Sequence, residues 1–182
     1  DDFQKPCELA VRALDALLDY QKYPVLAAEL SNQRRRPLGI GIINLAFWMA
    51  KHNMTYTDPN LPLIDEWAEA WSYYLIEASV KLAEEKGACE YSHETKYSDG
   101  IVPMDTRKED VDELVPNVER QNWIKLRSRL KKSGIRNSTL MALMPAETSA
   151  QISNSTNGVE PPRAFVSVKQ SKHGVLKQVV PG

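Results

Sequence analysis

The chain has 182 residues, 42% of them hydrophobic and 26% charged, which is enough for one domain with a real core and unlike a disordered segment. Its formal net charge of −1 excludes a general basic field for nucleic acid, and no apolar run approaches the roughly 18 residues of a membrane span. The two cysteines, Cys7 and Cys89, are too few for a disulfide framework, so we expect free thiols in a reducing cytoplasm.

The first predicted element is an amphipathic helix over residues 6–22. Pro6 suits a first helical turn, and Tyr23 precedes Pro24, where the chain leaves the helical region. Residues 31–37 are then predicted to be a polar connection. The apolar residues of the helix recur at spacings of three and four, at Leu9, Ala10, Ala13, Leu14, Leu17 and Leu18.

Three consecutive arginines, Arg34, Arg35 and Arg36, stand in that connection. Arginine suits phosphate and nucleic acid, but three residues are too few to favour such a contact. Gly39-Ile-Gly41 lacks the spacing of a dinucleotide fingerprint. The next residues are predicted to form a deeply buried helix, apolar on most of its surface, at Ile42, Ile43, Leu45, Ala46, Trp48 and Met49.

A long helix is predicted over residues 63–86, with Gly87 as its stop. Aromatic residues at helical spacing could stack on bases or line a cofactor, but core packing is the favoured interpretation. Asp65, Glu66 and Glu69 near the helix start suit the helix dipole and need no catalytic role. The predicted buried stripe consists of Trp67, Ala70, Trp71, Tyr74, Leu75, Ala78, Leu82 and Ala83.

Residues 88–103 contain side chains of metal-ligand type without the spacing of a zinc site, namely Cys89, Glu90, His93 and Glu94. We interpret this segment as a connecting loop. Two surface helices are predicted next, over residues 105–114 and 122–132, and Gly134 closes the second. The second helix turns Trp123, Leu126 and Leu130 inward, and its basic outer face is solvated or meets an acidic partner chain.

A short apolar run over residues 140–144 stops at a proline and is followed by hydroxyl residues. A buried strand ending at Met144 would lead through a turn into a helix whose first amides have no intrahelical acceptor. Free amides, two hydroxyls and the positive helix end suit phosphate, although this pattern alone is more often a plain N-cap. The candidate residues are Pro145, Ala146, Glu147, Thr148 and Ser149.

After this loop, residues 150–155 are predicted to form a short helix. Asn157-Gly158 and Pro161-Pro162 indicate a turn and an extended stretch. Two strands, over residues 164–169 and 175–180, then flank a glycine-containing turn and predict a hairpin. His173 in that turn is interpreted as a solvated loop histidine rather than a general base.

Several motifs together resemble the large subunit of ribonucleotide reductase. Its signature is matched closely by Trp123-Ile-Lys-Leu, by Gly134-Ile-Arg-Asn-Ser-Thr-Leu and by Ala142-Leu-Met-Pro. Residues 10–20, 36–44 and 153–163 resemble stretches of the same family in the same order. The resemblance extends over about residues 9–181 and is least specific at residues 55–122.

The resemblance implies a fold: part of the ten-stranded α/β barrel of that subunit, as a helix-rich fragment with a C-terminal β-hairpin. Residues 1–182 would form a partial barrel domain, with a helical portion at about 6–134 and the phosphate-loop strand, short helix and hairpin at about 137–180. In that family the arginines precede the helix that holds Gly39 and Gly41. These glycines would let the helix and the barrel backbone approach closely.

The resemblance also assigns the loop. The backbone amides of residues 146–149 would bind the substrate's phosphates, with the hydroxyls of Thr148 and Ser149 as further donors and Pro145 fixing the approach. The carboxylate of Glu147 would repel a diphosphate, so Glu147 is expected to contribute its amide. Many relatives carry serine where Ala146 stands, so a hydroxyl contact available to them is absent here.

The same family implies what this chain lacks. A reductase large subunit is several times longer, and its radical-bearing cysteine, regulatory region and one redox cysteine precede the matched segment, while its tyrosine pair and cysteine tail follow it. Neither Cys7 nor Cys89 matches any of these. We therefore expect an internal piece of a catalytic subunit, from a truncation or a split gene, with no catalytic residue, metal or cofactor of its own and no activity alone.

The whole enzyme would reduce ribonucleoside diphosphates at the 2′ carbon by a radical reaction, in the cytoplasm, for DNA synthesis. Its expected partners are the remainder of the large subunit, a metal-containing small subunit that supplies the radical, and thioredoxin or glutaredoxin. ATP and deoxynucleotide effectors would bind elsewhere in the full subunit. A cobalamin-dependent reductase has a similar barrel and phosphate loop, so the radical source follows from overall similarity alone.

Two other classes of protein remain open. The chain could be a structural fragment, because an opened barrel exposes apolar helix faces and strand edges that recruit other chains. It could instead be a self-sufficient phosphate-binding module that uses Thr148 and Ser149 outside any reductase. The second class is disfavoured because no lysine or arginine lies close in sequence to the loop.

Overall fold

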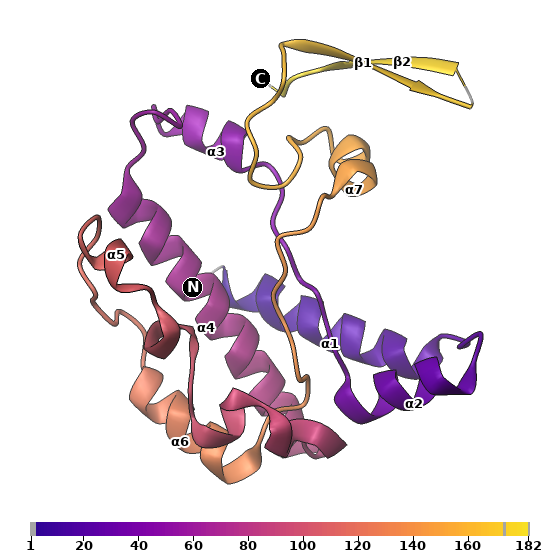
Figure 1. The fold of residues 1–182 in the computed structure, drawn as a ribbon, viewed down its shortest axis with the longest axis vertical. Coiled ribbons are helices and arrows are strands. Elements are labelled where there is room, and N and C mark those ends of the chain that lie inside the picture. Colours follow the sequence, from indigo (N-terminus) through magenta and orange to yellow (C-terminus); the bar gives the residue numbers. More distant parts are fainter. Residues whose placement is uncertain (1–2, 173, 182) are drawn as a thin grey trace. The chain divides into compact units, whose positions relative to one another are not determined.

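The computed structural model describes residues 3–172 and 174–181, and its contacts divide the chain into two units (Figure 1). Unit 1 is formed by Asp1–Ile40 and Leu61–Met141, and unit 2 by Gly41–Asn60 and Ala142–Gly182. Each unit therefore combines two separate stretches of sequence. His173, for which a solvated position was predicted, lies outside the described residues.

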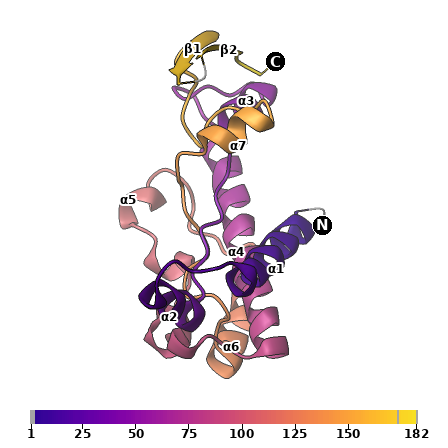
Figure 2. The same ribbon diagram turned by 90° about the vertical axis from the view of Figure 1, so that its right-hand side faces the viewer.

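Unit 1 is helical, and its longest helix, α4, packs against both α1 and α6 (Figures 1 and 2). Polar contacts advance in step along α1 and α4, which therefore run parallel: Gln4 meets Glu77, Glu8 meets Lys81 and Arg12 meets Glu85. The helices are α1 (Gln4–Tyr20), α2 (Leu26–Arg35), α4 (Leu61–Lys86), α5 (Glu109–Asp112) and α6 (Trp123–Ser133), with the short 3-10 helices η1 (Glu90–Glu94), η2 (Lys96–Asp99) and η3 (Pro103–Thr106).

The core of unit 1 lies between these helices, because each of them turns an apolar stripe inward. Trp123 of α6 is fully buried and meets the ring of Tyr73 edge to face, with ring centroids 5.1 Å apart. Its indole Nε1 donates a 2.9 Å hydrogen bond to the buried carboxylate of Glu69. Other buried apolar side chains are Val11, Leu75, Ile76, Val80, Leu82, Leu126, Leu130, Ile135 and Leu140.

A buried polar network links the separate segments of unit 1. The guanidinium of Arg36 donates to Asp15 Oδ1 and to Asp19 Oδ1, both at 2.7 Å, and Arg36 and Asp15 are buried. Asn137 Nδ2 donates to Asp15 Oδ1 at 3.0 Å, and Ser79 Oγ donates to Asn137 Oδ1 at 2.9 Å. Buried charges persist only when they are paired and hydrogen-bonded. The network therefore ties α1, α4 and the chain on both sides of Arg36 and Asn137 together.

Two extended segments of unit 1 lie side by side. The amide of Ile40 donates to the carbonyl of Leu140 at 2.8 Å, and Ile40 and Met141 form a parallel bridge. The predicted buried strand ending at Met144 is therefore wrong, because regular pairing does not continue beyond this bridge and residues 142–146 are irregular. Parallel strands need neighbouring strands to persist, and the described part of the chain offers none at this edge.

Unit 2 consists of α3 (Leu45–Lys51), α7 (Glu147–Ile152) and an antiparallel hairpin of β1 (Val166–Ser171) and β2 (Gly174–Val179). In the hairpin, Val166 pairs with Val179. The start of α3 is tied to the chain after α7: the Asn44 amide donates to the Thr156 carbonyl at 2.9 Å, and the Thr156 amide donates to Asn44 Oδ1 at 3.0 Å. Reciprocal hydrogen bonds thus join the two stretches of this unit.

The helices with a long amphipathic pattern are found where the sequence predicts them. The helices expected over residues 6–22, 63–86 and 122–132 correspond to α1, α4 and α6. Gly87 and Gly134 follow α4 and α6 with φ angles of 87° and 68°. The hairpin is also confirmed, but the short helix predicted over residues 150–155 begins three residues earlier and ends three residues earlier, as α7.

Three other predictions are wrong. Residues 31–37 are not simply a connection, because α2 continues to Arg35. The deeply buried helix expected after the arginines is reduced to α3, in which Met49 is the buried residue. Residues 105–114 do not form one surface helix, because they contain only the end of η3 and the single turn of α5.

Gly39 and Gly41 lie in an extended segment and not in the helix expected from the family. That segment is extended because its residues pair with residues 139–141. The close backbone approach expected of the glycines is nevertheless found at Gly41. A Cβ atom there would lie 2.6 Å from the carbonyl oxygen of Ala142 and 2.5 Å from Met144 Sδ. Only glycine fits such a space without displacing the neighbouring chain.

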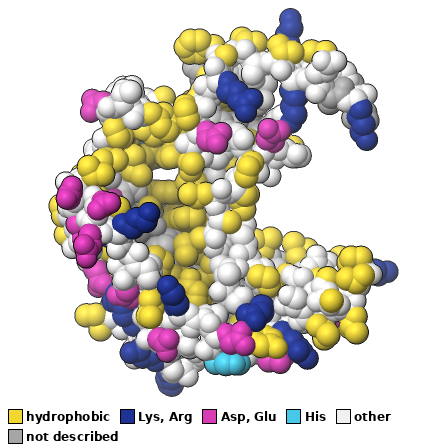
Figure 3. All heavy atoms as spheres, in the orientation of Figure 1, with side chains coloured by type: hydrophobic (Ala, Val, Ile, Leu, Met, Phe, Trp, Pro, Cys, Tyr) yellow, Lys and Arg dark blue, Asp and Glu magenta, His cyan; other side chains and the backbone are white. Residues whose placement is uncertain are grey.

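Apolar side chains also remain at the surface, where they are coloured yellow in Figure 3. In unit 1 they lie on α1 and at the start of α2, at Leu9, Leu17, Tyr20, Val25 and Leu26. In unit 2 they lie along the hairpin, at Val166, Val168, Val175, Leu176 and Val179. Among the helices of residues 3–172, none has both the length and the apolarity to cross a membrane.

Candidate functional site

The five predicted phosphate-binding residues lie together in unit 2, where the chain enters α7. Pro145, Glu147, Thr148 and Ser149 are exposed, and Ala146 is half-buried. Ala146 occupies the N-cap position with φ −114° and ψ 44°, and its side chain offers no oxygen to the first turn. The helix start is thus held by the backbone and open to solvent.

The first amides of α7 are available to an external acceptor. The amide of Ala150 is the first to bond within the helix, donating to the carbonyl of Ala146 at 2.8 Å. Among the described residues, no acceptor faces the amides of Glu147, Thr148 and Ser149, and no partner engages the hydroxyls of Thr148 and Ser149. Three amides and two hydroxyls at one helix start are donors that suit an anion.

Asn157 completes the loop, and its role was missed from the sequence. Its Oδ1 accepts a 2.7 Å hydrogen bond from the amide of Ala146, eleven residues earlier in the chain. The amide of Ala146, expected to face the phosphates, is therefore engaged inside the loop. Asn157-Gly158 was interpreted only as a turn, and no local pattern connects Asn157 with Ala146.

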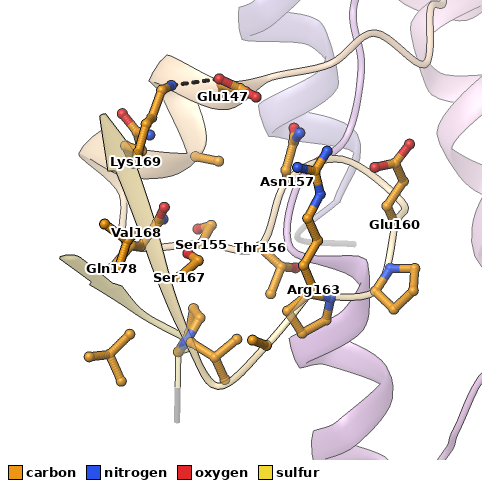
Figure 4. A pocket seen from close by; sticks show the side chains of 18 residues that line it. Glu147, Ser155, Thr156, Asn157, Glu160, Arg163, Ser167, Val168, Lys169 and Gln178 are labelled. Atoms are coloured by element: carbon orange, nitrogen blue, oxygen red, sulfur yellow. Dashed lines mark hydrogen bonds and ion pairs between the residues drawn. The ribbon is translucent and has the colours of Figure 1, made fainter. Parts of the chain in front are cut away.

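Glu147 turns its carboxylate towards the hairpin (Figure 4). Lys169 Nζ of β1 donates to Glu147 Oε2 at 2.6 Å, and this hydrogen bond lowers the pKa of Glu147 below its ordinary value. The ion pair neutralises the carboxylate that would otherwise repel an anion at the helix start. It also brings to the loop a lysine that lies 22 residues away in sequence.

A hollow of about 250 Å³ lies between α7, the chain that follows it and the hairpin (Figure 4). Of the five predicted site residues, Glu147 lines this hollow, and Thr148 and Ser149 do not. Pro145 borders a smaller hollow of about 70 Å³ together with Met144 and Asn157. The donors of Thr148 and Ser149 are thus displayed on an open surface of unit 2.

The other candidate residues have structural partners in unit 1. Arg34 pairs with Glu90 at 3.4 Å and Arg35 with Glu94 at 2.7 Å, while Arg36 belongs to the buried network. The aromatic stripe of α4 packs within the unit, where the rings of Trp67 and Trp71 stack with centroids 6.1 Å apart. These contacts favour structural roles over phosphate or base binding.

The two cysteines are buried free thiols. Burial raises the pKa of Cys7 to about 11 and also raises the pKa of Cys89. A thiol with a raised pKa is a poor nucleophile. Across residues 3–172 and 174–181, no group of three or more His, Cys, Asp and Glu side chains is placed to hold a metal ion.

Comparison with known proteins identifies the family of the chain that contains this loop. A family described as "Ribonucleotide reductase, barrel domain" matches residues 1–182. The ribonucleoside-diphosphate reductase subunit alpha of Haemophilus influenzae is 56% identical over 173 residues, covering 94% of this chain and 23% of that protein. The corresponding subunit of Buchnera aphidicola from Acyrthosiphon pisum is 54% identical over 182 residues, covering 100% and 24%.

A more distant source gives a similar result. The ribonucleoside-diphosphate reductase subunit alpha of Enterobacteria phage T4 is 50% identical over 181 residues, covering 100% of this chain and 24% of that protein. The chain thus spans about a quarter of the length of the curated relatives it matches. Because the family match covers every residue, the chain belongs to the ribonucleotide reductase barrel-domain family.

Proposed function

We propose that this chain is part of the catalytic subunit of a ribonucleoside-diphosphate reductase, which converts ribonucleoside diphosphates to deoxyribonucleoside diphosphates for DNA synthesis. The observation that carries the proposal is the family match over residues 1–182, together with relatives named ribonucleoside-diphosphate reductase subunit alpha. The reaction belongs to the whole subunit. This chain contributes binding and contains no residue that we assign to the redox chemistry.

Its contribution is the substrate-phosphate loop, Pro145 to Ser149. The amides of Glu147, Thr148 and Ser149 and the two hydroxyls belong to the first turn of α7, where a diphosphate would meet charge-assisted hydrogen bonds. Lys169 pairs with the Glu147 carboxylate and would offset its repulsion of a bound anion. Pro145 and Ala146 set the direction in which the chain enters α7.

In the whole protein, the fold would be the ten-stranded α/β barrel, with this chain as one helix-rich part of it. The parallel pairing of Ile40 and Met141 is the kind of contact that neighbouring barrel strands make. The remainder of the large subunit would supply the further strands. A radical-generating small subunit and thioredoxin or glutaredoxin would complete the enzyme in the cytoplasm, with ATP and deoxynucleotide effectors bound outside this chain.

The proposal is tested by Thr148→Ala combined with Ser149→Ala in the assembled reductase that contains this chain. Two donors to a charged phosphate are removed, so we expect binding of cytidine 5′-diphosphate to weaken by about 3 kcal/mol, or roughly a hundredfold. Equilibrium dialysis with radiolabelled nucleotide measures the dissociation constant directly.

The matched control is Thr57→Ala, which removes an exposed hydroxyl from the same unit at a position outside the loop. It should leave nucleotide affinity within twofold. Unchanged affinity in the Thr148/Ser149 double variant, with both proteins folded, would show that this loop does not bind the substrate.

A second candidate is a structural fragment that acts only by joining other chains, and the exposed apolar residues of α1 and its neighbourhood favour it, above all Leu9, Leu17 and Tyr20. A pull-down of the chain from its own cells, with mass spectrometry and a reductase assay, separates the two. Deoxynucleotide formation by the recovered complex supports the enzyme part. A complex without nucleotide binding supports the fragment.

A further inference from the structure

Asn157 occupies an unusual place in unit 2, because it reaches back over α7 to the residue that starts this helix. The bond from the Ala146 amide to Asn157 Oδ1 measures 2.7 Å and joins two residues that are eleven positions apart on either side of the six-residue helix. A helix this short has little stability of its own. The side chain of Asn157 therefore binds the amide of the N-cap residue itself, as the N3 side chain does in a capping box, and leaves the amides of the first turn without an acceptor.

The position of Asn157 is fixed by its two neighbours. Thr156 exchanges two hydrogen bonds with Asn44, at 2.9 and 3.0 Å, and the carbonyl of Gly158 accepts from the amide of Leu45 at 3.4 Å. Asn44 holds a left-handed backbone conformation with φ 71°, which asparagine tolerates better than most residues. The acceptor at Asn157 is thus anchored to the start of α3.

This bond occupies one backbone donor at the helix start, the amide of Ala146. With the Ala146 amide engaged by Asn157, the amides of Glu147, Thr148 and Ser149 keep no partner among the described residues. If the bond were lost, the first turn of α7 could rotate, and the three amides would no longer point in one direction. Directed donors bind an anion more tightly than donors that must be ordered during binding.

We propose that Asn157 is a positioning residue for nucleoside diphosphates: it holds the Ala146 amide so that the three following amides face the phosphates. The inference rests on the proposed function of the loop. Asn157 does not touch the ligand in this scheme, and it acts through Ala146. Its effect is therefore confined to ligands that carry phosphate.

The test compares Asn157→Ala with the unsubstituted protein in the assembled reductase, using cytidine 5′-diphosphate and cytidine as probes. We expect the dissociation constant of the diphosphate to rise roughly five- to tenfold, as for the loss of one ordering hydrogen bond. The inhibition constant of cytidine should change less than twofold. A purely structural role would weaken both ligands alike, and that result, or no change in either, overturns the inference.

The matched control is Asn154→Gly, two residues after the end of the same helix. Its side chain makes no hydrogen bond among the described residues, and its left-handed φ of 50° suits glycine. It should leave both ligands within twofold. Should Asn157→Ala reduce the amount of folded protein, Asn157→Ser removes the same long-reaching carbonyl and carries the same comparison between the two ligands.

The outcomes also separate this inference from the function on which it rests. If the Thr148/Ser149 double variant retains full diphosphate affinity, the loop assignment itself fails. If that double variant binds weakly while Asn157→Ala binds the diphosphate normally, the loop assignment stands and the positioning role of Asn157 is wrong.

Discussion

Different kinds of interaction stabilise the interior of each of the two units. Unit 1 packs large apolar side chains such as Trp123 around α4 and buries a charged network centred on Arg36. Unit 2 has few buried apolar side chains among its described residues, Met49, Met54 and Ala150, and depends on hydrogen bonds such as those of Asn44 and Asn157. Packing fixes the scaffold, while directional bonds fix the loop that carries the candidate site.

The largest effect should follow from breaking the network of unit 1 with Arg36→Met. Asp15 would then lose its 2.7 Å partner and keep only the guanidinium of Arg136 at 3.4 Å, and breaking a buried pair in this way costs about 3 kcal/mol of the free energy of unfolding. Urea unfolding followed by tryptophan fluorescence measures this loss, since Trp67, Trp71 and Trp123 all lie in unit 1.

Arg34→Met provides the matched control for that prediction. Arg34 stands two residues earlier, and its guanidinium pairs with Glu90 at the surface at 3.4 Å. Exposed ion pairs contribute little, so the free energy of unfolding should stay within about 0.5 kcal/mol. If both variants lost the same free energy of unfolding, the buried ion pairs of Arg36 would contribute no more to stability than the exposed ion pair of Arg34.

A smaller effect, of opposite sign, is expected in unit 2 from Ala146→Ser. A serine at the N-cap can accept a hydrogen bond from an amide of the first turn, which stabilises a helix start by about 1 kcal/mol. Amide hydrogen exchange should therefore slow in α7 and remain unchanged in α4. Ala164→Ser, an exposed position outside any helix, serves as the control, and equal protection of α7 in both variants would exclude the capping effect.

The smallest expected effect of a single group is the loss of folding stability at acidic pH. Hydrogen bonds from Arg36 and Arg129 lower the pKa of Asp19 and Glu84 below their ordinary values of 3.8 and 4.5. Lowered carboxyl pKa values stabilise the folded state above about pH 4.5, and this contribution disappears as the pH falls through the folded values. Unit 1 should lose stability progressively below that pH.

Urea unfolding at a series of pH values between 7 and 3 measures this trend. The groups are partly exposed, so the contributions are modest and should shrink further in 1 M salt. A free energy of unfolding that stays constant, or rises, on acidification would contradict the assigned ion pairs. In unit 2, Glu147 is the corresponding carboxyl with a lowered pKa, through its bond to Lys169.

Local sequence patterns predict the parts of the fold that depend on local physics. α4 and α6 follow from apolar residues at helical spacing and end at glycines with positive φ. α2 was missed because its few apolar residues, including Leu26 and Leu30, are exposed and mark no buried stripe. The segment before α3 was predicted to be helical, but its extended form depends on pairing with residues about a hundred positions later.

The candidate site divides in the same way. The candidate loop was predicted because the hydroxyl residues Thr148 and Ser149 follow Pro145 closely and because the segment resembles the family signature, and the structure has a helix start there. Asn157 and Lys169 could not be assigned to it, since they reach Ala146 and Glu147 across 11 and 22 residues through the fold. No spacing rule encodes such contacts, which arise only when α7 and the hairpin take their places within unit 2.

Position 41 should tolerate glycine and disfavour every other amino acid to a similar degree. The space beside it is closed by the carbonyl oxygen of Ala142, only 2.6 Å from where a Cβ would stand. Every other amino acid carries that carbon, so alanine and tryptophan meet the same first obstacle. Saturation mutagenesis at this position should therefore show a single step in stability between glycine and all replacements, without the gradation by size or polarity seen at ordinary buried positions.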